Sequence, residues 1–166
     1  DNIMLNDRTA IVTGGMGNIG KKIVETLVEL NCKVIIIDLP NENNKNQLNI
    51  MNNQLESNIE LYELNLEREE EIVNFCKNIL KTSKIDILVN CAALVGTSNL
   101  EGWAVPFENQ SMKTFDRCMD VNVKAPIILI QNLLDNFKKS SNIKIINISS
   151  IYGIRANDFS IYKDTN

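Results

Sequence analysis

Short apolar runs alternate with amphipathic stretches along the whole of this chain. Each apolar run is five or six residues long and is followed by a turn or a change to helical spacing. Runs of this kind are typical of strands that other elements cover on both faces. The sequence therefore predicts strands at Thr9–Thr13, Lys33–Ile37, Ile59–Leu64, Ile85–Val89 and Ile143–Ile148.

Amphipathic stretches separate the predicted strands. An acidic first turn opens a helix predicted over Glu67–Thr82, and a weaker helix is predicted over Gln47–Glu56. Ser111 can cap a long helix that continues to about Lys139, with an adjustment at Pro126. The apolar face of the first helix consists of Ile19, Ile23, Leu27 and Leu30.

The alternation of strand and helix predicts an α/β fold. A chain of this pattern forms a doubly wound parallel sheet with right-handed crossovers, the arrangement of a Rossmann fold. The chain shows no internal repeat, no low-complexity linker and no second-domain boundary. We therefore expect residues 1–166 to form a single domain.

A glycine cluster follows the first predicted strand and opens the first helix. Gly15-x-Gly17-x-x-Gly20 matches the dinucleotide fingerprint, in which backbone N–H groups and the positive end of a helix bind a pyrophosphate. Asp38 closes the second strand, where a carboxylate accepts hydrogen bonds from ribose hydroxyls and repels the 2′-phosphate of NADP. We therefore expect NAD rather than NADP. The plainer alternatives are a tight turn for the glycines and a turn-capping acid for Asp38.

Composition and charge narrow the classes of function. The 166 residues are 44% apolar and carry a net charge of −4, which argues against a nucleic-acid binder. No apolar run approaches the ~20 residues of a membrane span, and no signal peptide is recognisable, so we expect a cytoplasmic protein without a membrane partner. Histidine is absent, which argues against a metal site and against Ser-His-Asp or Cys-His catalysis within this chain. The four cysteines are expected to be small buried side chains in a reducing compartment.

Five motifs in order resemble those of the short-chain dehydrogenases/reductases. Thr13–Gly20 is similar to the family's T-G-x-x-x-G-x-G, and Asp38 is similar to its NAD-selecting acid. Asn90–Ala93 is similar to N-N-A-G after the fourth strand, Asn122 to a helix asparagine, and Ile146–Ser150 to a serine motif on the fifth strand. The resemblance covers essentially the whole chain. It implies an NAD(P)-binding Rossmann domain and hydride transfer between nicotinamide and a secondary alcohol or ketone.

The resemblance also implies roles for single residues. Ser150 would bond the carbonyl or hydroxyl of the substrate, and Asn122 would hold a water molecule in a proton relay. The alternatives are a hydroxyl of Ser150 that satisfies its own turn and an Asn122 side chain that mends the helix backbone near Pro126. The cofactor-binding residues that the resemblance implies are Gly14, Gly17, Asn18, Ile19, Gly20, Asp38, Asn65, Leu66, Asn90 and Ala92.

The chain departs from the family pattern at several positions. Asn18 stands where the family has a second glycine, although asparagine tolerates unusual φ values better than most residues. Asn65 stands where an aspartate usually contacts adenine, so it removes a charge but keeps an acceptor oxygen. Cys91 replaces an asparagine and is expected to loosen the turn after the fourth strand.

The tyrosine and lysine that the family uses as its acid/base pair are not both found here. Tyr162 lies twelve residues after Ser150, but Asn166 occupies the position four residues further on, and the adjacent Lys163 would point in another direction on a helix. Family members related to bacterial surface-sugar biosynthesis are similar through residues 149–153 and carry an insertion here. By that likeness, we expect the catalytic tyrosine and lysine to lie beyond Asn166 and the sheet to be incomplete at its C-terminal end.

Three hypotheses for function follow. The chain is part of an NAD-dependent oxidoreductase acting on a small alcohol or ketone, with a sugar derivative suggested by likeness alone. The alternatives are a dinucleotide-binding module without chemistry and, because Gly14-x-x-Gly17-x-x-Gly20 fits the extended branch of the family, an NAD-retaining sugar-nucleotide epimerase or dehydratase. By resemblance we expect a homodimer or homotetramer. The residues of the long helix that serve either the core or such an interface are Met112, Phe115, Met119, Leu129, Leu133 and Phe137.

Overall fold

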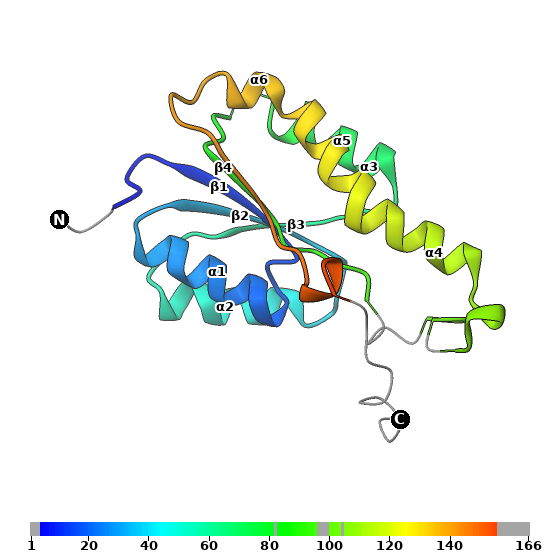
Figure 1. Ribbon diagram of the computed structural model, residues 1–166. Coiled ribbons are helices and arrows are strands. Elements are labelled where there is room, and N and C mark those ends of the chain that lie inside the picture. The colour runs from blue at the N-terminus through cyan, green and yellow to red at the C-terminus, as the bar shows by residue number, and fades with distance from the viewer. Residues whose placement is uncertain (1–3, 82, 96–99, 104, 156–166) are drawn as a thin grey trace.

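The predicted strands pair as one parallel sheet in the order β3-β2-β1-β4-β5. The structure is a computed structural model and describes residues 4–81, 83–95, 100–103 and 105–155 (Figure 1). The chain runs from β1 out to β3 and then returns to β4, so β1 and β4 flank the point where the strand order reverses. This confirms the α/β, doubly wound parallel fold. The strands are β1 (Thr9–Thr13), β2 (Lys33–Asp38), β3 (Glu60–Glu63), β4 (Ile87–Asn90) and β5 (Lys144–Asn147).

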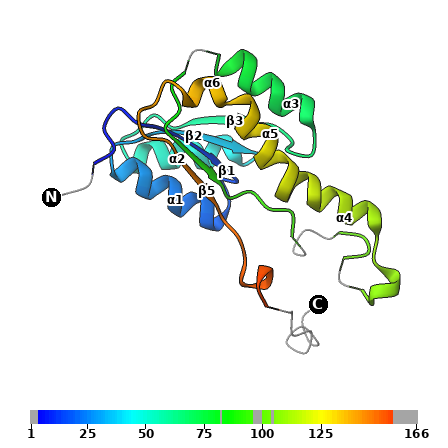
Figure 2. The ribbon, with the colours of Figure 1, turned by 45° about the horizontal axis from the view of Figure 1, so that its top comes forward.

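Helices lie on both faces of this sheet, as Figure 1 and the turned view of Figure 2 show. One face carries α1 (Asn18–Glu29) and α2 (Asn44–Gln54). The opposite face carries α3 (Glu69–Asn74), α5 (Ala125–Asn132) and α6 (Leu134–Phe137), and α4 (Met112–Met119) continues beyond the sheet. In the described part of the chain, no helix is both long enough and apolar enough to cross a membrane.

The core consists of two apolar clusters, one on each face of the sheet. Successive side chains of a strand point to opposite faces, so each strand supplies both clusters. In β1, Ile11 packs with Ile72 and Leu129 under the second helix layer, whereas Val12 packs with Val24 on the side of α1. This alternation explains why the strands are apolar throughout rather than apolar at every second position.

The long helix predicted from Ser111 to Lys139 is divided in the structure. The Ser111 hydroxyl accepts a hydrogen bond from the Thr114 N–H at 3.3 Å, which confirms the predicted cap. A π-helical turn at Asp120–Lys124 then separates α4 from α5, whose second residue is Pro126. Proline has no N–H, and its ring crowds the carbonyl four residues earlier, so a wider turn at this place leaves room for that carbonyl. The adjustment predicted at Pro126 is therefore a π-turn.

Strand β5 differs from the prediction that every strand is covered on both faces. All four of its residues are exposed, with Ile145 at 41% and Ile146 at 47%. Within the described residues β5 stands at the edge of the sheet and borders only β4, and the exposure of consecutive side chains shows that neither of its faces is covered there. The long helix also differs from a purely buried element, because Met112 and Phe115 are exposed while Leu129 is buried.

Candidate functional site

The first feature of the site is the glycine turn between β1 and α1, at the carboxyl end of the sheet. Gly14 has φ +67°, and a Cβ atom there would lie 2.8 Å from the Cα of Ala92. A Cβ atom at Gly20 would lie 2.0 Å from the Gly14 carbonyl oxygen. Both positions therefore require glycine, because the backbone of the turn packs directly against the loop after β4 and against the helix.

The N-terminus of α1 is open to a ligand. The first helical hydrogen bond into this turn runs from the Lys21 N–H to the Gly17 carbonyl at 2.8 Å, so the N–H groups of Asn18, Ile19 and Gly20 precede it. Among the described residues no side chain caps this helix at its N-cap residue, Gly17, and its first turn carries no acidic residue. These free N–H groups and the positive helix end suit an anionic phosphate.

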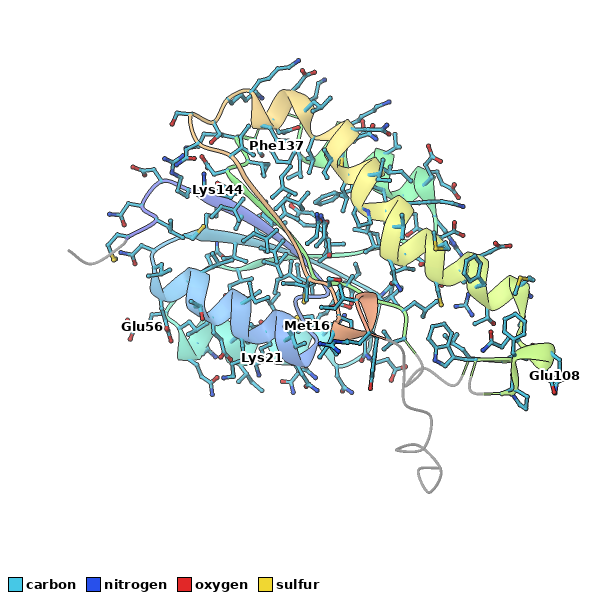
Figure 3. The ribbon with its side chains drawn as sticks, viewed as in Figure 1. Met16, Lys21, Glu56, Glu108, Phe137 and Lys144 are labelled. Carbon is cyan, nitrogen blue, oxygen red and sulfur yellow. The ribbon has the colours of Figure 1, made fainter. Side chains whose placement is uncertain are left out.

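Asp38 links the second strand to this glycine turn. One carboxylate oxygen accepts the Met16 N–H at 2.8 Å, and the other accepts the Leu39 N–H at 2.8 Å. Among the residues that the structure describes, no ion pair involves Asp38. In Figure 3, Met16 lies at this end of the sheet and Lys144 at the opposite end. The carboxylate thus lies beside the turn with oxygen lone pairs still available.

The last residue of β1 binds the backbone of the turn after β4. The Thr13 hydroxyl oxygen accepts the N–H groups of both Cys91 and Ala92, each at 3.0 Å. The side chain of Cys91 takes no part in these bonds, and the expectation that Cys91 loosens the turn stays a prediction. Burial, and after it the charge of Asp38, raises the pKa of the Cys91 thiol. Cys91 is half-buried, whereas the other three cysteines are buried as expected.

Asn90 and Asn147 join the two strands on the far side of this turn. The Asn90 amide donates to the side-chain oxygen of Asn147 at 2.8 Å. The Asn90 side-chain oxygen is buried and has no hydrogen-bond partner in the described part of the chain. A buried acceptor without a partner can bind a donor from a ligand or from water, which agrees with a place beside a binding site. Sequence reasoning did not single out Thr13 or Asn147 as organisers, although both belong to motifs that it quoted.

Asn65 and Leu66 follow β3 at the same edge of the sheet. The Leu64 N–H donates to the Asp38 carbonyl at 2.9 Å, which brings this loop beside the end of β2. Leu66 is only 8% exposed and packs into the core, so its side chain is not available to a ligand. The Asn65 side-chain oxygen accepts the Glu67 N–H at 2.9 Å, forming a turn closed by its own side chain.

An ion pair fastens this loop to α4. The Arg117 guanidinium donates to both carboxylate oxygens of Glu67, from Nε and from Nη2, each at 2.8 Å. The hydrogen bond from Arg117 lowers the pKa of Glu67 and outweighs the opposing effect of burial. Two parallel bonds of this kind hold both orientation and distance. Sequence reasoning missed both residues, because fifty positions separate them.

The two predicted catalytic residues lie in separate local networks. The Asn122 side chain, within the π-turn, accepts the Leu94 N–H at 2.8 Å and donates to the Leu94 carbonyl at 3.1 Å. It thereby ties the helix to the loop after β4, rather than to the helix backbone near Pro126. The Ser150 hydroxyl is exposed and accepts the Tyr152 N–H at 3.2 Å, which caps a short 3₁₀ helix at Ile151–Gly153.

Tyr162, Lys163 and Asn166 lie outside the described residues. Within the described ranges, no three or more aspartate, glutamate or cysteine side chains form a cluster that could hold a metal ion.

Comparisons with known proteins agree with this arrangement. The family described as short chain dehydrogenase matches residues 8–163. The 3-oxoacyl-(acyl-carrier-protein) reductase FabG of Rickettsia prowazekii is 35% identical over 156 residues, which are 93% of this chain and 58% of that protein. An uncharacterized oxidoreductase of Thermotoga maritima is 29% identical over 89% of this chain and 55% of its own length. The chain thus spans little more than half the length of these curated relatives.

Solved structures show the same fold. A short chain dehydrogenase from Shigella flexneri 2a, crystallised in complex with NADP, matches with a TM-score of 0.80 and 23% identity, covering 95% of this chain and 64% of that one. A short chain dehydrogenase from Escherichia coli CFT073 matches with a TM-score of 0.79 and 24% identity, covering 93% and 67%.

Proposed function

This chain belongs to the short chain dehydrogenase family, and we propose that residues 1–166 form the single dinucleotide-binding domain of an NAD-dependent oxidoreductase. The observation that carries the proposal is the open N-terminus of α1, with Asp38 hydrogen-bonded to the glycine turn beside it. A dinucleotide needs a phosphate site with a ribose site next to it, and this edge of the sheet supplies both.

The phosphate site is built from backbone alone. The pyrophosphate would bind the N–H groups of Asn18, Ile19 and Gly20, with Gly14 and Gly17 allowing the close approach. The backbone of Ala92 and the side chain of Asn90 lie on the other wall of the turn, held there by Thr13 and Asn147. Binding and orientation by these groups require no movement of the turn, because its contacts are already formed.

The ribose site favours NAD over NADP. Asp38 is a carboxylate without a partner cation in the described residues, and its oxygens already accept two backbone N–H groups. Hydroxyls of the adenosine ribose can donate to the remaining lone pairs, whereas a 2′-phosphate would meet a like charge. Among similar folds, the Shigella flexneri protein was crystallised with NADP, so the preference rests on Asp38 of this chain and not on the neighbours.

The proposed reaction is hydride transfer between the nicotinamide and a secondary alcohol or ketone. The cofactor supplies this hydride chemistry when bound. Ser150 would hold the substrate oxygen through its hydroxyl, which at present accepts the Tyr152 N–H and still carries a donor proton. Asn122 would fix the loop after β4 through Leu94 and hold the relay water. A tyrosine and a lysine outside the described residues would complete the acid/base pair.

Assembly and location are proposed on separate grounds. Four apolar side chains on the outer face of α4, the π-turn and α5 are 42–64% exposed, which suits a homodimer or homotetramer formed through these helices. Those residues are Met112, Phe115, Val123 and Ile127. We place the protein in the cytoplasm because its four cysteines are free in the structure, as in reducing compartments.

Calorimetric titration of the full-length protein with NADH and NADPH tests the proposal. NADH is expected to bind at least about fivefold more tightly, because two like charges at 4 Å repel by roughly 1 kcal/mol even in bulk water. Asp38→Asn should bring the dissociation constants for NADH and NADPH closer together. Asp135→Asn, which removes an exposed carboxylate from α6, is the matched control and should leave the ratio of the two dissociation constants unchanged. Absence of binding by both dinucleotides would overturn the proposal.

A further inference from the structure

The carboxyl end of β3 carries a second carboxylate beside Asp38. In the parallel pairing of β2 with β3, Asp38 lies in register with Glu63, and neighbouring strands of a sheet are about 4.8 Å apart. Both side chains face the side of α1 and α2, because Ile36 and Leu61, two residues earlier on each strand, pack in the apolar cluster of that side. The two carboxylates therefore stand next to each other beside the proposed ribose site.

The loop after β2 holds the Glu63 side chain in place. One carboxylate oxygen of Glu63 accepts the side-chain amide of Asn44 at 2.8 Å and the Asn41 N–H at 3.2 Å. The same Asn44 amide donates to the Leu39 carbonyl at 2.9 Å, and Asn44 is only 4% exposed, so it is a buried anchor for the loop. The second oxygen of Glu63 has no hydrogen-bond partner among the described residues.

Glu63 also determines the charge that a ligand meets at this edge of the sheet. The hydrogen bond from Asn44, and after it the bond from the Asn41 N–H, lowers the pKa of Glu63, so the carboxylate is ionised at neutral pH. From Asp38 to Asn44 the sequence contains no lysine or arginine. Lys45 follows, and its charge acts on Glu63. Glu63 therefore offsets the cation that a phosphate at this place would otherwise meet.

We propose that Glu63 is a second specificity-determining residue of the dinucleotide site, and that its carboxylate excludes a 2′-phosphate together with Asp38. The inference rests on the proposed function, because it takes the end of β2 as the ribose site. A ribose 2′-hydroxyl that donates to Asp38 lies at the strand end where Glu63 is the next side chain across the sheet. A phosphate on that hydroxyl would meet two like charges instead of one. Asp38 supplies the acceptor for the ribose, whereas Glu63 contributes its charge.

Calorimetric titration of the full-length protein with NADH and NADPH at low salt tests this role. Glu63→Gln keeps an acceptor oxygen for Asn41 and Asn44 but removes the charge. It should lower the dissociation constant for NADPH about threefold, as expected of one like charge a few ångströms away across water, and leave that for NADH unchanged. In about 1 M salt, where the Debye length is roughly 3 Å, this difference should largely disappear. Glu60→Gln removes the same charge from the opposite end and the opposite face of β3, so both dissociation constants should stay unchanged.

A second comparison separates the charge of Glu63 from an effect transmitted through Asp38. In a protein that already carries Asp38→Asn, Glu63→Gln should lower the dissociation constant for NADPH by a similar factor, because each carboxylate repels the phosphate directly. If Glu63→Gln has no effect in that protein, Glu63 acts only through Asp38, and its role as a second specificity-determining charge is overturned.

Failure of this inference is distinguishable from failure of the proposed function. If neither dinucleotide binds the natural protein, the dinucleotide site itself is refuted, and this inference falls with it. If both bind but Glu63→Gln changes the two dissociation constants by the same factor, or changes neither, the site is retained and the specificity role of Glu63 is overturned. The measured quantity is a ratio of two constants in one protein, so a lower melting temperature of Glu63→Gln would not imitate the expected result.

Discussion

The buried Asp86 carboxylate offers the sharpest prediction of stability, at the end of the sheet opposite the site. Its side chain is fully buried before β4. One oxygen accepts Arg8 Nη1 at 2.7 Å and the Ser140 hydroxyl at 2.6 Å, and the other accepts the Thr9 N–H at 2.9 Å. Asp86 thereby joins β1 and β4 to the segment that leads into β5.

The contribution of Asp86 to the free energy of folding follows from its pKa. Burial opposes ionisation, but the hydrogen bonds from Ser140, Thr9 and Arg8 outweigh it and lower the pKa from 3.8 to about 2. A shift of this size corresponds to about 2 kcal/mol of folding free energy at neutral pH. Since the folded pKa is the lower one, this stability is present above pH 3.8 and is lost as the pH falls toward 2. About half of it, roughly 1 kcal/mol, should be gone at pH 3.

Urea unfolding of the full-length protein at pH 7 and pH 3 measures both effects. Asp86→Ala should lower the free energy of unfolding at pH 7 by about 3–5 kcal/mol, because it leaves a buried guanidinium contact, a hydroxyl and an N–H without their acceptor. The loss between pH 7 and pH 3 should be about 1 kcal/mol smaller in this variant than in the natural protein. Asp135→Asn, on an exposed carboxylate, is the control. Equal pH dependence in Asp86→Ala and the natural protein would refute the assignment.

Three further changes test the contacts around the site. Thr13→Val removes the acceptor for the Cys91 and Ala92 N–H groups and should lower the free energy of unfolding in urea by about 1–3 kcal/mol. The variant should also bind NADH more weakly. An unchanged free energy of unfolding and an unchanged NADH affinity would contradict the role of Thr13. Asn122→Ala should speed hydrogen exchange of the Leu94 amide. An unchanged exchange rate would show that the hydrogen bond from the Leu94 N–H to the Asn122 side chain does not form. Asp38→Asn should lower the raised pKa of the Cys91 thiol, so alkylation by iodoacetamide at pH 8 should become faster; slower alkylation would contradict the charge effect.

Local patterns in the sequence were sufficient for the fold and for part of the site. The apolar runs predicted all five strands of the sheet, and the glycine cluster with Asp38 predicted the edge of the sheet at which we propose the nucleotide site. Strand and helix periodicities are properties of neighbouring residues, so they can be read without knowing what lies across the fold. The same is true of the Ser111 cap and of the helix adjustment at Pro126.

The sequence alone determined the layers of this protein and the position of its glycine turn, and the tertiary structure decided which side chains hold the site. The pairs Asn122 with Leu94, Arg117 with Glu67, and Thr13 with Cys91 join residues that lie 28, 50 and 78 positions apart. The turn at Asn65 involves such a pair as well, because the Asn65 side-chain oxygen accepts the N–H of Glu67, whose carboxylate Arg117 binds. Hydrogen-bond partners at these separations are set by how the loops meet at the sheet edge, and no periodicity of the chain encodes that meeting.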